Sequence, residues 1–109
     1  MLDEREFRAR SEEAIDSLNR TLGQAAETYD FEVDMNAGAL TVELEEPPAK
    51  FVVSPNAPVR QIWVSAHSKS FKLDWNSAKN AFELATTGET LEQLIAARVS
   101  EHLGETVEL

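Results

Sequence analysis

The sequence predicts an α+β fold, a two-layer α/β sandwich in which two helices cover one face of a sheet of about six mainly antiparallel strands. Three observations support this prediction. The first and last segments repeat apolar residues at helical intervals, the segments between them alternate apolar and polar residues with a period of two, and short turn-forming stretches separate those segments. Because tight connections join consecutive strands, we expect neighbouring strands to pair antiparallel.

The first predicted helix spans residues 3–23. Asp3 and Glu6 have the spacing of an N-terminal cap pair, and Gly23 is expected to end the helix because glycine tolerates the left-handed conformation. The residues that form its core-facing stripe are Phe7, Ser11, Ala14, Ile15, Leu18 and Leu22.

The second predicted helix begins at Thr90, where Thr90 and Gln93 have capping-box spacing, and ends at Gly104. Between the helices, the clearest strand is 29–35, and Asn36 to Gly38 supply the turn of a hairpin whose second arm is 40–44. Pro47 and Pro48 interrupt the alternation. The remaining strands are expected at 51–53, 61–65, 71–75 and 81–85, with a turn at 54–58 closing the first of these.

Length and composition limit the class of protein. With 109 residues, of which 42% are hydrophobic, the chain is expected to form one domain over 1–109. The sequence has no apolar run of the length that a membrane span needs and no apolar segment of a signal peptide, so we expect a protein that is not secreted. The absence of cysteine excludes disulfides, thiolate metal sites and cysteine nucleophiles.

The formal net charge of -10 is unevenly distributed along the chain. Residues 1–46 contain 13 Asp or Glu and 4 Arg, whereas residues 47–109 contain 7 Asp or Glu and 6 Lys or Arg. A one-sided negative field repels phosphate groups and attracts cations or basic protein surfaces. We therefore expect no binding to nucleic acid or to anionic membranes.

The residues for several kinds of catalysis are missing. The two imidazoles, His67 in a predicted loop and His102 near the chain end, stand in no catalytic context and are expected to be solvated. The four glycines are widely spaced at predicted turns and caps, so no phosphate-binding loop is predicted. We expect no organic cofactor and no enzymatic activity.

Carboxylates are the chemistry that the sequence does supply. Glu12 and Asp16 are i, i+4 neighbours opposite the apolar stripe of the first helix, and oxygen ligands of this kind suit hard cations. The strand 29–35 adds three more carboxylates, about 6.5 to 7 Å apart, which is too wide for a tight mononuclear cage and favours weak, exposed, multi-site binding. The candidate metal ligands are Glu12, Glu13, Asp16, Asp30, Glu32 and Asp34. Acids in the first helical turn are left out because they complement the helix dipole whatever the function.

One aromatic residue is expected on the open face of the sheet. If Ile62 and Val64 point into the core, Trp63 points to the opposite face. A lone aromatic residue there is usually just partly covered by its neighbours, but exposed tryptophan is also enriched in binding hot spots. By the same alternation, Trp75 is expected to point inward with Phe71 and Leu73.

Three segments together resemble the frataxin family in order and spacing. They are Gln61-Ile62-Trp63-Val64-Ser65, Leu73-Asp74-Trp75 and Leu91-Glu92-Gln93-Leu94-Ile95-Ala96-Ala97. The resemblance covers nearly the whole chain, because Glu12 to Leu18 resembles the family's first helix and Gly38 to Val42 its first hairpin.

This resemblance implies a helix-sheet-helix sandwich that binds iron weakly and associates with a cysteine desulfurase and an iron-sulfur scaffold protein. It implies that the six candidate ligands form an acidic ridge for Fe²⁺ or Fe³⁺, and that Gln61 and Trp63 belong to a sheet surface that faces partners. Where mitochondrial forms carry Asn and Arg in this contact, the present chain has Ser54 and Lys72. The ridge is also shortened and contains a cation, because this chain has Asn19, Arg20, Gly23 and Gln24 where family members often continue acidic residues.

The expected function is therefore modulation of iron-sulfur cluster assembly, as an iron donor or an iron sensor, by a monomer that forms iron-dependent oligomers at most. We expect a cytoplasmic bacterial protein, and a mature mitochondrial form would have the same sequence features. One alternative is an iron-oxidising and iron-storing oligomer with ferroxidase-like activity; it ranks lower because the chain lacks the Glu-x-x-His pair of di-iron helices. Another is an acidic mimic of nucleic acid.

Overall fold

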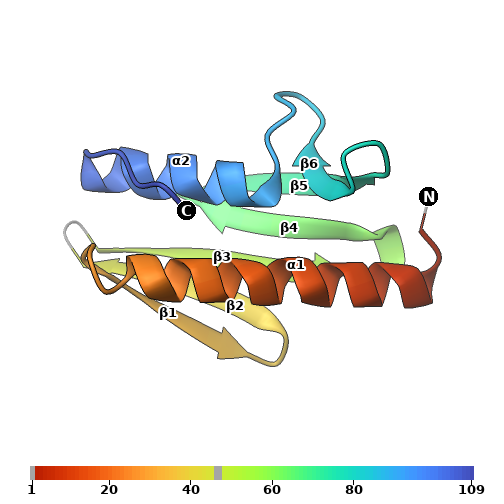
Figure 1. The fold of residues 1–109 in the computed structure, drawn as a ribbon, viewed down its shortest axis with the longest axis horizontal. Helices are drawn as coiled ribbons and strands as arrows, with labels where there is room; N and C mark the ends of the chain where they lie inside the picture. The colour runs from red at the N-terminus through yellow and green to blue at the C-terminus, as the bar shows by residue number, and fades with distance from the viewer. Residues whose placement is uncertain (1, 46–47) are drawn as a thin grey trace.

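The computed structural model describes residues 2–45 and 48–109 and has the predicted α+β architecture, with two helices on one face of an antiparallel sheet (Figure 1). The two helices run in the same general direction across that face (Figure 1). Along the chain the elements are α1 Glu4–Ala25, β1 Phe31–Asn36, β2 Ala39–Glu45, β3 Pro48–Asn56, the 3-10 turn η1 Ala57–Val59, β4 Gln61–Ala66, β5 Lys69–Asn76, β6 Ala81–Leu84 and α2 Leu91–Leu103.

The six strands lie side by side in sequence order, and each pairs antiparallel with the next. The β1–β2 turn consists of Ala37 and Gly38, which both have positive φ angles, 53° and 84°. Two-residue turns of this kind match the right-handed twist of the strands that they join. The turn therefore sets the register of the first hairpin, in which Val33 lies opposite Val42.

The core lies between the sheet and the helices. One side of each strand contributes fully buried apolar residues, such as Leu40, Phe51 and Ile62, and α1 and α2 cover them with Leu22 and Leu94. Residues in between along the strands lie on the opposite face, which no helix covers (Figure 1). This arrangement leaves one open face of the sheet for contacts outside the molecule.

Three of the four predicted helix ends, at Asp3, Thr90 and Gly104, are confirmed. The Asp3 carboxylate accepts a hydrogen bond from the backbone N–H of Glu6 at 2.8 Å, which lowers the pKa of Asp3. Thr90 and Gln93 form the expected reciprocal capping box. Gly104 ends α2 in the left-handed region with φ 72°.

The prediction that Gly23 ends the first helix was wrong. The helix continues to Ala25, with Ala26 as a cap in helical conformation. A glycine permits a helix to end but does not force it, and the following Gln24 and Ala25 are good helix formers.

Several strand boundaries also differ from the sequence prediction. The first strand begins at Phe31 rather than Tyr29, because the chain makes a turn after α1 in which the Phe31 N–H donates to the Tyr29 carbonyl. β3 begins already at Pro48 and continues to Asn56, so Pro48 starts the strand instead of interrupting it. Pro47 lies outside the described residues. β5 and β6 agree with the prediction to within two residues at each end.

The C-terminal tail folds back along α2 (Figure 1). Val107 is buried in the core, and its N–H donates to the Ser100 hydroxyl at 2.9 Å. The Tyr29 hydroxyl donates to the Thr106 carbonyl at 3.4 Å, which ties the tail to the segment after α1. These contacts attach the C-terminal tail to α2 and to the segment that follows α1.

The stability of the fold is expected to depend on Glu83 at acid pH. Lys79 Nζ and Asn76 Nδ2 donate to its two carboxylate oxygens at 2.7 and 2.6 Å, and these hydrogen bonds lower the pKa of Glu83 below its ordinary value of 4.5. A lowered folded-state pKa stabilises the protein above the unfolded-state value, and this stabilisation is lost as the pH falls through the folded-state value.

We therefore expect Glu83→Gln to flatten the decrease in unfolding free energy between about pH 5 and about pH 3, measured by urea denaturation. Glu105→Gln is the matched control, because Glu105 is exposed in the tail, and it should retain the wild-type pH profile. A pH profile of Glu83→Gln as steep as that of the wild type would contradict the assignment.

Candidate functional site

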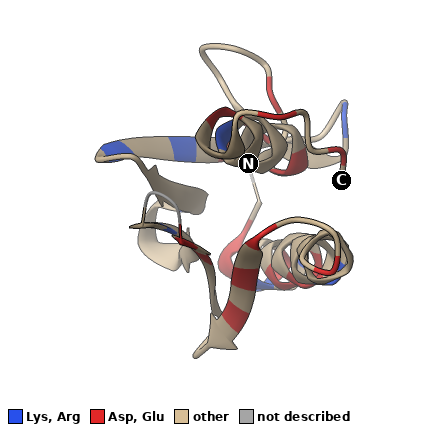
Figure 2. Cartoon of the chain, turned by 90° about the vertical axis from the view of Figure 1, so that its left-hand side faces the viewer, with Lys and Arg blue, Asp and Glu red and all other residues tan. Residues whose placement is uncertain are grey.

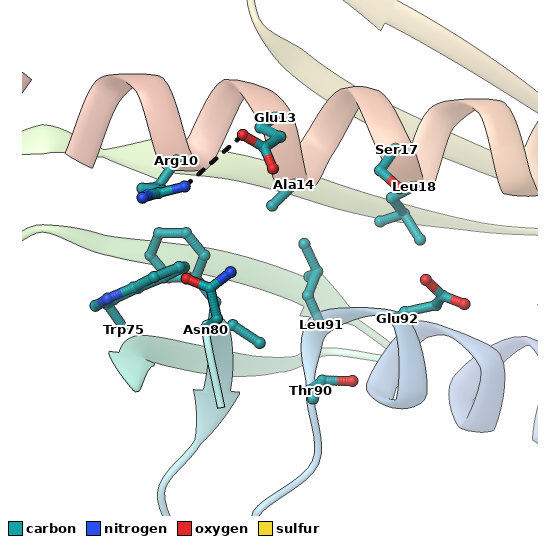
Figure 3. A pocket seen from close by; sticks show the side chains of 12 residues that line it. Arg10, Glu13, Ala14, Ser17, Leu18, Trp75, Asn80, Thr90, Leu91 and Glu92 are labelled. Atoms are coloured by element: carbon teal, nitrogen blue, oxygen red, sulfur yellow. Dashed lines mark ion pairs between the residues drawn. The ribbon is translucent and has the colours of Figure 1, made fainter. Parts of the chain in front are cut away.

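The three helix carboxylates of the predicted ridge do not share one side of α1. Glu12 lies against the β1–β2 turn, where it lines a small hollow with Ala37 and Gly38. Glu13 lies on the side that faces the start of α2, within 4.0 Å of Arg10 (Figure 3). Asp16 is exposed and lies four residues after Glu12 and three after Glu13, so it is a helical neighbour of both. The structure therefore separates the surroundings of Glu12 from those of Glu13, and Asp16 lies between them.

The cleft beside Glu13 has a volume of about 290 Å³ and lies between α1, the β5–β6 turn and the start of α2 (Figure 3). The Arg10 guanidinium lies 5.5 Å from the centroid of the Trp75 ring, and Trp75 packs edge-on against Phe82 at 5.2 Å. Trp75 thus points to the helix side of the sheet as predicted, although it is half-buried rather than fully buried.

The strand carboxylates meet the C-terminal end of α1. Glu32 and Asp34 are exposed on β1, and together with Gly23 and Ala26 they line an open hollow of about 570 Å³. Asp30 is exposed in the bend before β1 and is therefore not part of the strand, contrary to the sequence interpretation. The small residues at positions 23 and 26 leave this side of the hollow open.

Glu43 is a further acidic residue of this hollow that the sequence analysis did not single out. It lies on β2 directly opposite Glu32, and both residues are exposed. The alternation of β2 together with a two-residue turn at 37–38 could have placed it there, because these two features fix the hairpin register. Like charges directly opposite each other destabilise a strand pair. Lys50 lies opposite Glu43 on the other side and offsets part of this repulsion, and a bound cation would relieve the remainder.

The described residues contain no group of three His, Asp or Glu side chains close enough to hold one metal ion together. The donors available along α1, β1 and β2 are carboxylate oxygens, which suit hard cations such as iron, but they are exposed and spread over three elements. This donor set fits weak binding of a partly hydrated ion.

Acidic and basic residues lie on different parts of the sheet. Figure 2 shows Asp and Glu on the edge strand next to α1, and Lys on a strand at the other side of the sheet. On the open face, Glu32 and Asp34 of β1 contrast with Lys50 of β3 and Lys72 of β5. A partner that covers this face would therefore meet a negative and a positive region side by side.

The predicted partner residues form a connected network on the open face, the sheet-face patch of Ser54, Gln61, Trp63 and Lys72. Trp63 Nε1 donates to Gln61 Oε1 at 3.0 Å, and Gln61 Nε2 donates to Asp74 Oδ1 at 3.0 Å. Lys72 Nζ lies 5.0 Å from the centroid of the Trp63 ring. Trp63 lies opposite both Ser54 and Lys72 in the sheet.

The orientation of Trp63 follows the prediction. Its side chain is 38% exposed, whereas Ile62 is 0% and Val64 1% exposed. The hydrogen bond to Gln61 and the contact with Lys72 hold the indole in place, which reduces the conformational entropy that binding would cost. Asp74 was not among the predicted partner residues, yet it positions Gln61.

The two histidines lie together rather than apart. His67 Nε2 and His102 Nδ1 are 2.9 Å apart, and the rings differ by 15° in plane, with centroids 5.1 Å apart. The residues are far apart in the sequence, in the β4–β5 turn and the last turn of α2, so no local pattern could have predicted the contact. Phe51 packs edge-on against His67 at 5.0 Å. The pair joins the sheet to α2.

A family model for the frataxin-like domain matches residues 1–105 of the chain. The chain belongs to the frataxin-like family. It is 32% identical over 102 residues to an iron-sulfur cluster assembly protein, CyaY, of Azotobacter vinelandii, and the match covers 92% of each protein. It is 31% identical over 101 residues to the CyaY protein of Pseudomonas aeruginosa, with 92% of this chain and 94% of the relative covered.

The fold of this frataxin-like chain is also that of a solved structure, a frataxin from Psychromonas ingrahamii. The TM-score is 0.76, the sequence identity is 21%, and the match covers 98% of this chain and 97% of the other. No helix in 2–45 or 48–109 is both long and apolar enough to cross a membrane.

The repulsion between Glu32 and Glu43 in the hollow at the end of α1 can be tested by measuring stability. We expect Glu32→Gln to raise the unfolding free energy by about 0.5 kcal/mol at low ionic strength, because it removes a like charge from a directly opposed pair. The gain should shrink near about 0.15 M salt, where exposed charges are screened. Glu108→Gln, an exposed tail variant with the same change in net charge, is the control for general charge effects. An equal gain in both variants would argue against a specific pair.

Proposed function

We propose that this protein takes part in iron-sulfur cluster assembly as a non-enzymatic modulator that docks on a cysteine desulfurase and its scaffold protein. The relatives that match it over most of its length are named for that process. The observation that carries the proposal is the exposed Trp63, held by Gln61 and Lys72 on a sheet face that no helix covers.

The sheet-face patch has the features of a binding anchor. Exposed tryptophans at the centre of a contact area contribute more to binding than most other residues, and an indole already held in position loses little freedom on binding. Ser54 and Lys72 flank Trp63 on the neighbouring strands, so one partner surface can cover all three. We assign this patch to the scaffold protein.

Iron is proposed to bind weakly along the predicted ridge. Glu12 and Asp16 on α1, and Asp30, Glu32 and Asp34 at β1, offer oxygen ligands, and Glu13 contributes less because Arg10 lies beside it. Glu43 is added to this set because it lines the same hollow as Glu32 and Asp34. The ridge would also meet a basic surface of the desulfurase, so that bound iron changes the strength of this contact.

The chain is proposed to act as one domain in the bacterial cytoplasm. A single cluster of buried residues contains side chains from both helices, all six strands and the tail residue Val107, which supports one cooperative unit over 1–109.

Metal binding can be mapped by NMR. Titration with Mn²⁺, and with Fe²⁺ under anaerobic conditions, is expected to broaden the amide signals of Glu32, Asp34 and Glu43 most strongly, at low affinity, because these carboxylates line one hollow. The double variant Glu32→Gln/Glu43→Gln should lose this broadening, while Glu105→Gln should keep it. Broadening centred on the 72–109 half would remove the ridge assignment.

Partner binding can be separated from folding at the two tryptophans. Trp63→Ala is expected to lower the unfolding free energy by about 1 kcal/mol or less, because the side chain is partly exposed, and to weaken binding to the desulfurase–scaffold complex about tenfold or more. Trp75→Ala, which removes contacts with Phe82 and Arg10, should cost about 2 kcal/mol and leave binding by the folded protein unchanged.

Urea denaturation and calorimetric titration with the purified complex measure the two effects. If Trp63→Ala destabilises the protein as strongly as Trp75→Ala, or leaves partner affinity intact, the sheet-face contact is wrong.

A further inference from the structure

The outer side of β5 is only partly covered. β6 is four residues long and pairs with residues 73–76 of β5, whereas β5 begins at Lys69. Residues 69–72, the free β5 edge, pair with β4 on one side and with no strand of the described chain on the other. The outer edge of β6, in contrast, is paired: Glu83 forms a bridge with Thr90, and the Leu84 N–H donates a hydrogen bond to the Glu89 carbonyl. A free strand edge offers backbone donors and acceptors to another extended chain.

A groove runs beside this edge. It has a volume of about 480 Å³ and is bounded by β5, the end of β6, the loop before α2 and Arg98 of α2. Phe71 and Leu84, both half-buried, supply apolar surface in it. Its size corresponds to a few residues of extended peptide, as does the length of the four-residue edge. An edge and an adjacent apolar groove are the two parts of a strand-addition site.

Arg98 has an unsatisfied donor at this groove. Its Nε atom is buried and has no hydrogen-bond partner in the described structure. The guanidinium lies 5.8 Å from the centroid of the Phe71 ring, and its Nη2 is 3.6 Å from the Glu101 carboxylate. The side chain as a whole is 24% exposed and lines the groove, so a carboxylate bound there would meet the exposed part of the guanidinium group rather than the covered Nε.

The charge around the free β5 edge is opposite to that of the whole chain. Lys69, Lys72 and Arg98 surround it, and Glu89, which accepts a hydrogen bond from Thr87 at 2.9 Å, is the carboxylate that lines the groove. The chain as a whole has a formal net charge of -10. Lysines on an edge strand discourage pairing with apolar strands. The same lysines favour an extended segment that carries carboxylates.

We propose that the free β5 edge and its groove bind a short, extended, acidic segment of a partner protein, which pairs with residues 69–72 and places a carboxylate near Arg98. The backbone edge supplies general affinity, and the cations supply the preference for acidic sequences. This site lies at the edge of the sheet and on its helix side; it shares Lys72 with the sheet-face patch, whose Trp63 lies on the opposite face.

A second copy of this chain is the rival occupant. The other edge strand, β1, carries Glu32 and Asp34 and could add to the β5 edge of a neighbour. Such head-to-tail contact would not close and would produce chains of growing length. The experiment therefore measures self-association as well as peptide binding.

The probe is a fluorescein-labelled, end-capped hexapeptide that alternates valine and glutamate, compared with one that alternates valine and lysine. The acidic peptide is expected to bind, to shift the amide signals of residues 69–72 and to slow their hydrogen exchange, whereas the lysine peptide should not. Arg98→Met should weaken binding about tenfold, because it removes a charge-assisted hydrogen bond. Arg20→Met removes the same charge from the exposed side of α1 and should leave affinity unchanged.

A second variant keeps the test informative if Arg98→Met folds poorly. Lys69→Gln changes an exposed side chain. It should weaken binding of the acidic peptide several-fold without changing the melting temperature of the protein. Equal binding of the two peptides, or full affinity in both variants, overturns the proposal. If signals of residues 69–72 shift with protein concentration alone and sedimentation shows oligomers, the occupant is a second copy and the assignment to a partner is wrong.

Discussion

Leu40, Phe51, Ile62 and Leu73 lie with no exposed surface under two helices, and this burial of one face of the sheet determines most of what the molecule presents outside. In a strand, a buried residue forces its neighbours to the opposite face, so the identity of the open face follows from the packing of the core. A shift of one residue in a strand would expose core residues and bury the polar or charged residues of the open face. The free energy of apolar burial therefore fixes the register of every strand.

The consequences of that register differ between the two halves of the sheet. On β1 and β2 it places Glu32 opposite Glu43, which repel each other and create a region that favours cations. On β4 and β5 it places Trp63 opposite Lys72, which attract each other and hold an aromatic side chain in position. The first half thus retains unbalanced charge suited to a weakly bound ion, and the second half presents a prepared contact surface.

Much of this could be predicted from local patterns. The caps at Asp3 and Thr90 were predicted because a capping side chain acts on a backbone group three residues away. Gly23 misled the prediction, since a residue that permits a helix end does not decide where packing stops the helix. Asp30 was placed on the strand because its spacing fits the alternation, but the turn after α1 delays the strand by two residues. The assignment of the six ridge residues to metal and of the sheet-face patch to a partner stays a prediction.

The sequence by itself determined the order and type of the elements, the side of the sheet on which Trp63 lies, and the uneven charge, because each depends on periodicity or composition along the chain. Only the tertiary structure decided which distant side chains meet. It placed Glu12 beside the β1–β2 turn and Glu13 beside the start of α2, brought Glu43 together with the end of α1, paired His67 with His102, and left part of β5 uncovered beside Arg98. These contacts depend on how the elements pack across the core. The spacing of residues along one element contains no information about which other element lies next to it.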